Sequence, residues 1–309
     1  MLAIMIGLVI GIGLPIQTSI NSRLKVSLGS PFLASLTSFT VGTILLAIIT
    51  LIADHSLFFP LKMFTEQPVW LWIGGIFGVT YLTANILLFP KLGSVQTVIM
   101  PVLGQIIMGL IVDNFGLFYS LKDPLTLIRI LGAILVLLGV IGAVSINELI
   151  SKRHHKMDSE SSGLFIWRLF GIIAGMLSAA QAAINGHLGA ILHSTVKAAF
   201  FSFLIGTLCI LVIVIITRPK LQMIKSEKGN PWWMWIGGII GALYILGNVY
   251  LVPIVGTGLS VVIILLGLMI GSLMIDQFGI LESKKNPITL AQIISLLVMI
   301  CGVVIIRLF

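Results

Sequence analysis

Gln17-Thr18-Ser19-Ile20-Asn21 is matched 164 positions later by Gln181-Ala182-Ala183-Ile184-Asn185. Each copy lies in a long run without charged residues, so each forms a polar spot in an otherwise apolar helix. Glutamine and asparagine four positions apart lie on one face of a helix, one turn above the other. In hydrocarbon their amides have no water to bond, so they must face protein, a wet cavity or a ligand. The pair therefore predicts a polar site to which both halves of the chain contribute.

The composition excludes a soluble globular domain, because 58% of the residues are hydrophobic and 9% are charged, against roughly 25% charged in ordinary globular chains. A helix needs about 20 apolar residues to cross a bilayer. The uncharged runs predict an all-α integral membrane protein with ten transmembrane helices. They are expected at Ala3–Ser22, Pro31–Ala53, Pro68–Pro90, Leu92–Val112, Ile130–Asn147, Leu169–Gly186, Ala198–Thr217 and Asn286–Ile306, with Pro231–Ile275 divided in two near Pro253, Gly256 and Gly258.

An internal repeat organises the chain. Phe39 and Gly42 recur at the offset of 164 as Phe203 and Gly206, and after one deletion the offset is 163. Each half holds five predicted spans, an odd number, so the second half enters the membrane from the opposite side and the repeats are inverted. We expect a first five-helix repeat over residues 1–147, a cytoplasmic linker over 148–163 and a second repeat over 164–309.

The formal charge of +8 is distributed like that of a membrane protein rather than a nucleic-acid-binding one. The connections that follow the odd-numbered spans hold 13 of the 18 Lys and Arg residues, and the opposite side holds 5. Cytoplasmic loops carry the excess of Lys and Arg. Both termini are therefore predicted outside, the lipid bilayer is the expected environment, and no nucleic acid is expected as a partner.

A second matched set supports a central cavity. Tyr81 and Asn85 recur as Tyr244 and Asn248, again four positions apart. Inverted repeats bring equivalent elements together near the bilayer midplane, where transporters bind substrates. The alternative is that these side chains only bond between helices, at ~0.6 kcal/mol each. The candidate substrate-binding residues are Gln17, Asn21, Tyr81, Asn85, Gln181, Asn185, Tyr244 and Asn248, together with Gln96 and Gln105, whose counterparts Leu259 and Leu268 are apolar.

Asp113 and Asp276 are candidates for gating or coupling, because each closes a span in the pattern Asp-x-Phe-Gly. A carboxylate at a helix C-terminus is disfavoured by the helix dipole, so each needs a cation or a helix-ending turn. Lys122 and Lys284 or Lys285 are the candidate partners. We favour a gate or loop anchor over a proton carrier, since acids mark proton relays chiefly when they lie inside the membrane.

The motifs resemble those of the YdcZ-type branch of the drug/metabolite transporter superfamily. They are the Pro-x-Gln-x-x-x-Asn-Ser-Arg-Leu run at 15–24, the Phe-x-x-Gly at 39–42 and the Asp-x-Phe-Gly helix ends. The resemblance implies a bacterial inner-membrane transporter of two fused five-helix repeats. Small multidrug relatives carry a glutamate in their first helix that binds proton and cationic drug in turn. Here the runs 3–22 and 169–186 contain no acid.

The sequence thus favours a multipass carrier that moves a small polar or zwitterionic metabolite by alternating access, as a monomer or homodimer. A multidrug or cation exporter, a membrane enzyme and a scaffold remain as alternatives. The chain has no cluster of His, Cys, Asp or Glu at membrane depth, so we assign no catalytic residue, metal or cofactor. Substrate identity, direction of transport and coupling ion are left open.

Overall fold

The computed structural model describes residues 2–59, 61–151, 161–221, 230–282 and 288–308, and these are helical apart from turns and short connections. The first half contains α1 (Leu2–Leu28), α2 (Pro31–Asp54), α3 (Leu61–Glu66), η1 (Val69–Trp72), α4 (Gly74–Phe115), η2 (Leu117–Tyr119) and α5 (Leu127–Ser151). The second contains α6 (Ser161–Ile191), α7 (Thr195–Thr217), η4 (Trp232–Trp235), α8 (Gly237–Val255), α9 (Thr257–Phe278), η5 (Ile280–Glu282) and α10 (Leu290–Leu308).

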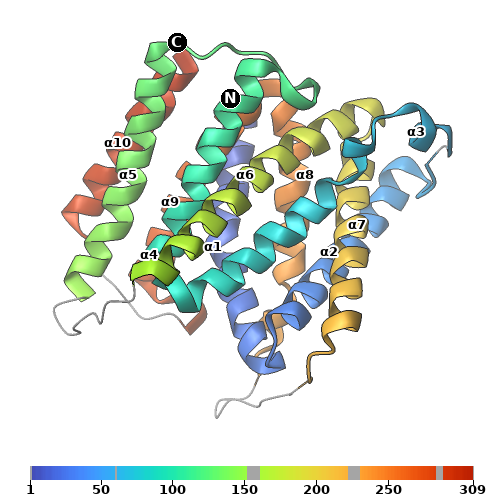
Figure 1. Cartoon of the computed structure of the whole chain (residues 1–309), viewed down its shortest axis with the longest axis horizontal. Coiled ribbons are helices and arrows are strands. Elements are labelled where there is room, and N and C mark those ends of the chain that lie inside the picture. The colour runs from blue at the N-terminus through green and yellow to red at the C-terminus, as the bar shows by residue number, and fades with distance from the viewer. Residues whose placement is uncertain (1, 60, 152–160, 222–229, 283–287, 309) are drawn as a thin grey trace.

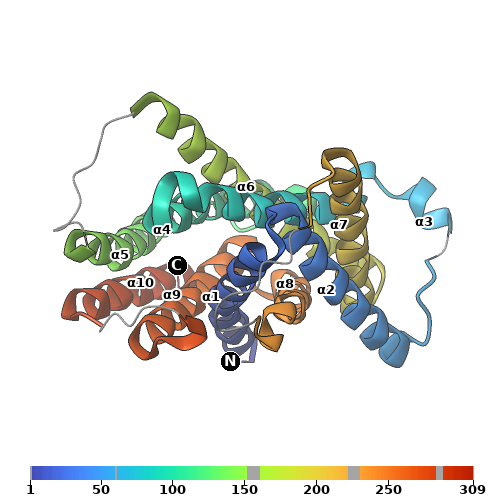
Figure 2. The ribbon, with the colours of Figure 1, turned by 90° about the horizontal axis from the view of Figure 1, so that it is seen from below.

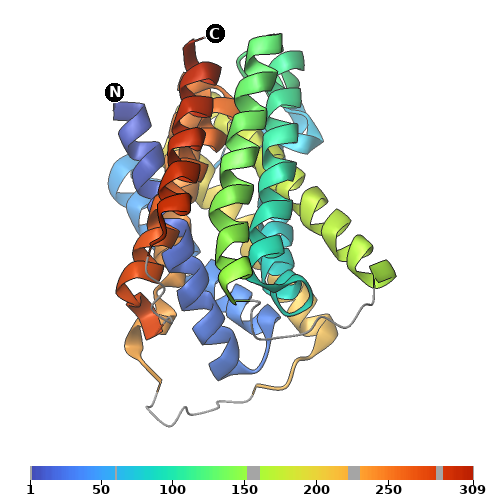
Figure 3. The same ribbon diagram turned by 90° about the vertical axis from the view of Figure 1, so that its left-hand side faces the viewer.

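Within the described residues, six helical segments are long and apolar enough to cross a membrane. They are Leu2–Leu28, Pro31–Asp54, Leu164–Ile191, Thr195–Thr217, Gly237–Val255 and Thr257–Ile275. Shorter apolar helices, Gly74–Leu88, Ile99–Phe115, Leu127–Gly142 and Leu290–Ile306, occupy the other predicted spans. Both termini lie at the same end of the molecule, opposite the turn between α1 and α2 (Figure 3).

Helix α4 differs from the expectation of two separate spans, since its 42 residues carry one continuous helical assignment. A straight helix of that length would measure about 63 Å, twice the thickness of a bilayer core. Figure 1 shows that α4 instead bends sharply and turns back on itself. Its apolar segments Gly74–Leu88 and Ile99–Phe115 therefore form two arms with different directions. In the second half the predicted break is confirmed, because Gly256 separates α8 from α9 at a φ of 84°.

Several predicted boundaries were wrong. Helix α1 continues past Ser22 to Leu28. Helices α5 and α6 take in residues at both ends of the expected linker, of which 152–160 lie outside the described residues. The start of the expected span Pro68–Pro90 forms the short 3₁₀ helix η1 instead. A charge-free run marks only the part of a helix that lies in the membrane. The helix itself continues for as long as its backbone hydrogen bonds do, so it can extend beyond that run.

Counterpart residues of the two halves contact one another. Thr43 and Thr207 share a hydrogen bond of 2.7 Å, and the rings of Phe39 and Phe203 lie 5.1 Å apart. Figure 2 shows the paired helices at the two edges of the molecule, α2 with α7 and α5 with α10.

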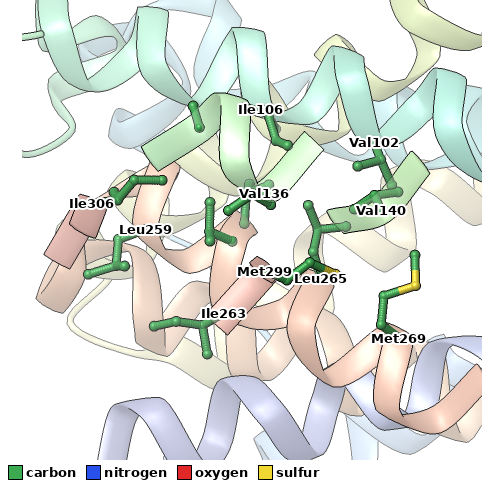
Figure 4. Packing of buried hydrophobic residues seen from close by; sticks show 14 residues of the cluster. Val102, Ile106, Val136, Val140, Leu259, Ile263, Leu265, Met269, Met299 and Ile306 are labelled. Carbon is green, nitrogen blue, oxygen red and sulfur yellow. The ribbon is translucent and has the colours of Figure 1, made fainter. Parts of the chain in front are cut away.

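Glycines let helices of the two halves approach closely where they meet. A Cβ added to Gly75 would collide with the carbonyl oxygen of Ser202, and one added to Gly238 would collide with that of Ser38. Away from this contact, α4, α5, α9 and α10 enclose an apolar core that includes Val102, Val136, Leu265 and Met299 (Figure 4).

Candidate functional site

A partly open cavity lies between the two repeats, bordered by α1, α2, α4, α6, α7 and α8. Its lining is built from counterparts. The pairs are Leu14 and Ser178, Gln17 and Gln181, Phe39 and Phe203, Gly78 and Gly241, Tyr81 and Tyr244, and Leu82 and Ile245, joined by Ser38. None of the described residues that line this cavity is charged.

Each glutamine of the cavity packs against a glycine of the opposite repeat. A Cβ added to Gly241 would collide with the amide nitrogen of Gln17, and one added to Gly78 would lie 2.5 Å from that of Gln181. The absence of a side chain at each glycine therefore makes room for an amide. This arrangement places the glutamines of the quoted sequence pair where the repeats meet.

The two cavity tyrosines lie among polar side chains from both repeats. Those of Asn85 and Gln105 are close to Tyr81, and those of Asn248 and Ser178 are close to Tyr244. The amide nitrogen of Asn248 donates to the backbone carbonyl of Tyr244 at 3.1 Å, and that of Gln105 donates to the Ser178 hydroxyl at 3.3 Å. The Gln105–Ser178 bond joins the two repeats beside both tyrosines.

Asn21 and Asn185 are buried and are not among the residues that line the cavity. The side-chain oxygen of Asn21 packs closely against Gly237, and that of Asn185 packs closely against Gly74. Each asparagine therefore reaches the start of a helix in the other repeat. The two differ at the amide nitrogen. Asn185 donates to the Ser202 hydroxyl at 3.0 Å, whereas Asn21, 2% exposed, has no hydrogen-bond partner for either amide atom. An unpaired buried polar group costs about 1–3 kcal/mol.

Asp113 connects three helices at one end of the molecule. Its carboxylate accepts the backbone N–H groups of Thr257 and Gly258 at 2.8 and 2.7 Å, and so caps α9 from the end of α4. Arg129 of α5 lies 3.9 Å from the same carboxylate and 2.9 Å from that of Asp123. A carboxylate at a helix N-terminus is stabilised by free N–H groups and by the dipole, so this geometry favours an anchor over a proton carrier.

The expected partner of Asp113 was wrong, because Arg129 rather than Lys122 forms the ion pair. Arg129 lies six residues beyond Asp123 on the first turn of α5, where its guanidinium also donates to the Asp123 carbonyl at 2.6 Å. The Asp-x-Phe-Gly pattern does end helices, since Gly116 and Gly279 take φ of 61° and 64°, which favour glycine. The side chains of Asp276, Lys284 and Lys285 lie outside the described residues.

The chain matches a protein family described as "Putative inner membrane exporter, YdcZ" over residues 2–142 and again over residues 166–305. These two segments cover most of both halves. The chain belongs to this family. Membership in the YdcZ family makes it an integral membrane protein of the transporter class and assigns it to the inner membrane.

Structural comparison supports the fold of this YdcZ-family chain. It is similar to a solved structure described only as "Crystal structure of protein", with a TM-score of 0.69 and 16% identity. The match covers 98% of this chain and 94% of the other. At this identity the likeness concerns the fold alone. No curated protein matches the chain.

The YdcZ-family cavity contains four of the ten predicted substrate residues, namely Gln17, Tyr81, Gln181 and Tyr244. Asn85, Asn248 and Gln105 stand behind them, hydrogen-bonded to residues of the lining. Asn21 and Asn185 pack against glycines, and the side chain of Gln96 lies outside the described residues. Substrate contact by any of these residues remains a prediction.

Sequence reasoning missed the apolar half of the lining and its serines. Phe39 and Phe203 were visible as repeat counterparts, and their position three residues before a matched glycine on a packed helix was the available signal. Ser38 precedes Phe39, and Ser202 precedes Phe203, so this match extends to the serines. Ser178 carried no such signal, because its counterpart is Leu14.

Proposed function

We propose that this YdcZ-family chain is a carrier that exports a small polar or zwitterionic metabolite by alternating access, with ten crossing helices arranged as two inverted repeats. The observation that carries the proposal is the cavity between the repeats, because six pairs of counterparts build it. A site on the axis between inverted repeats can be opened to either membrane face by rocking one repeat against the other.

The chemistry of the lining disfavours a cationic substrate. Two glutamines, two tyrosines and two serines offer hydrogen bonds, and phenylalanine and leucine side chains supply apolar surface. Transfer of an isolated ion into such a site without a paired charge is costly. Of the sequence-based alternatives, the cation exporter is therefore the less favoured, since no acid lies among the described lining residues.

The orientation follows from the 13-to-5 distribution of Lys and Arg and can be tested by labelling. In a protein with Cys209 and Cys301 replaced by alanine, Phe58→Cys should react with an impermeant maleimide in intact cells. Leu221→Cys, at the opposite end of the molecule, should react only after the membrane is opened. Both native side chains are exposed, at 88% and 64%. Labelling of Leu221→Cys but not Phe58→Cys in intact cells would reverse the proposed orientation.

Asn21–Ser38 in the first repeat and Asn185–Ser202 in the second are equivalent pairs. Alternating access predicts that one of them is hydrogen-bonded in each state. The Asn185–Ser202 bond is formed, whereas Asn21, which occupies the equivalent position, is unbonded although Ser38 is the counterpart of Ser202. When inverted repeats exchange conformations, the opposite state should form the Asn21–Ser38 bond and break the other. In each state, one of the two asparagines therefore lacks a hydrogen bond to its serine.

The test uses two identical substitutions at paired positions. Ser202→Ala removes a bond of the present state and should shift the population toward the opposite state, whereas Ser38→Ala should shift it back. One hydrogen bond of about 1 kcal/mol corresponds to roughly a fivefold change in population. The readout is the ratio of labelling rates at the counterpart reporters Ser19→Cys and Ala183→Cys, without substrate. Shifts in the same direction for both serine variants would contradict alternating access by exchange.

A further inference from the structure

We infer that the substrate is a molecule without ionised groups that carries a hydrogen-bonding group at one end and an apolar body at the other, and that Ser178 and Gln105 select that group. The inference rests on the proposed carrier function and narrows its substrate class. It comes from a place where the two repeats are chemically unequal beside a cavity that is lined mainly by paired residues.

Ser178 and Gln105 break the symmetry of the site. Their counterparts are Leu14 and Leu268, both apolar, and yet Gln105 donates to Ser178 at 3.3 Å with both residues buried. Gln105 lies beside Tyr81 and Ser178 lies beside Tyr244, so this bond joins the two repeats next to both tyrosines. Ser178 and Gln105 therefore form a hydrogen-bonding corner on one side of the cavity. Leu14 occupies the matching position on the other side.

The corner can bind one more polar group. A hydroxyl offers one donor and two acceptor positions, and the Ser178 hydroxyl accepts one hydrogen bond from Gln105. Ser178 can therefore bind a further polar group, and Tyr244 lies beside it. Ser178, Tyr81 and Tyr244 all line the cavity, so a ligand in it can reach these positions.

The rest of the lining does not favour a charged group on the ligand. Leu14, Phe39, Phe203 and Ile245 supply apolar surface, and the described lining contains no ionised side chain. An ammonium or carboxylate placed here would lose its hydration without gaining an opposite charge. Burial of an apolar body against this surface is favourable instead. The cavity thus prefers neutral molecules with two unlike ends.

The test compares probes that share one skeleton and differ in charge. N-acetyl-L-leucinamide is neutral, leucinamide is a cation, N-acetyl-leucine is an anion and leucine is a zwitterion, whereas N-acetylglycinamide lacks the apolar body. Binding to purified full-length protein in detergent is measured by thermal shift, because a ligand of the folded state raises its apparent stability. N-acetyl-L-leucinamide should bind at least tenfold more tightly than each of the other four.

Variants that copy the counterpart residues locate the binding corner. Ser178→Leu and Gln105→Leu should each weaken N-acetyl-L-leucinamide binding about tenfold, whereas the control Ser19→Ala, at a serine outside the lining, should keep the wild-type affinity. Ser178→Ala serves in place of Ser178→Leu if the larger side chain prevents folding, and it should weaken binding in the same direction. Unchanged affinity in the folded Ser178 and Gln105 variants would overturn the assignment of the corner.

The remaining outcomes separate this inference from the proposed function. Binding of leucine, leucinamide or N-acetyl-leucine as tight as that of N-acetyl-L-leucinamide, or no binding of N-acetyl-L-leucinamide at all, would overturn the neutral substrate class. Counterflow of labelled N-acetyl-L-leucinamide in proteoliposomes, compared with protein-free liposomes, tests transport separately. Selective binding without counterflow would refute the carrier and leave the site intact. Counterflow of a charged probe alone would refute the substrate class and support the carrier.

Discussion

Replacing Asp113 with alanine is expected to lower the free energy of unfolding by about 3 kcal/mol, at the lower end of the 3–5 kcal/mol typical for breaking a buried ion pair. The carboxylate is 1% exposed and satisfies two backbone N–H groups at the start of α9. Its loss would leave those groups without their acceptor and would deprive the buried Arg129 of one of its two carboxylates. Unfolding of the purified protein in mixed micelles, titrated with SDS, measures the change.

Two further variants show whether the loss comes from this anchor. Glu66→Ala removes an exposed acid from α3 and should change stability by less than about 0.5 kcal/mol. Arg129→Met in the Asp113→Ala protein should recover part of the loss, because the guanidinium no longer lies buried with one carboxylate missing. An Asp113→Ala protein as stable as the wild type would show that the carboxylate is not an anchor, and a role in coupling would then gain weight.

Removal of both tyrosine hydroxyls of the cavity should have the largest effect on transport. The double variant Tyr81→Phe, Tyr244→Phe is expected to lose about a hundredfold in transport efficiency, since each lost hydrogen bond is worth up to about 1.4 kcal/mol, or tenfold. Phenylalanine keeps the ring and the volume, so folding should be preserved. Counterflow of labelled N-acetyl-L-leucinamide in proteoliposomes provides the measurement.

The asparagines behind the tyrosines provide the matched control. Asn85 and Asn248 lie beside Tyr81 and Tyr244, and we expect them to act through these tyrosines. Asn85→Leu should therefore reduce transport in the wild type but should add little in the Tyr81→Phe protein, because residues of one network are not additive. Losses that multiply in the combined variant would show that Asn85 contacts the substrate itself, as its sequence pattern first suggested.

Much of the fold could be predicted because it depends on quantities that a sequence carries directly. The lengths of uncharged runs located the apolar helices, and Gly256 with Pro253 located the break between α8 and α9. The repeat offset identified which residues are counterparts, and contacts such as Thr43–Thr207 agree with it. Helix ends were less predictable, because α1 and α6 continue beyond their apolar runs.

The candidate site was predictable only in part, since a buried membrane helix is apolar on all sides and its sequence carries no signal for rotation about its axis. Gln17 and Asn21 share one face of α1, and yet Gln17 lines the cavity while Asn21 presses on Gly237. Which of two polar neighbours reaches the cavity depends on the helices packed against them. The pairing of Asp113 with Arg129 depends on packing in the same way.

The sequence by itself determined that this chain crosses a membrane, that it consists of two related halves and that each half contributes a Gln, an Asn and a Tyr to polar spots in apolar helices. Only the tertiary structure decided which of these side chains meet. It joined Gln105 to Ser178 across 73 positions of sequence and left Asn21 unbonded while Asn185 is bonded. The physical reason is that composition and spacing set what a helix can bury, whereas close packing at glycines sets the distances on which hydrogen bonds depend.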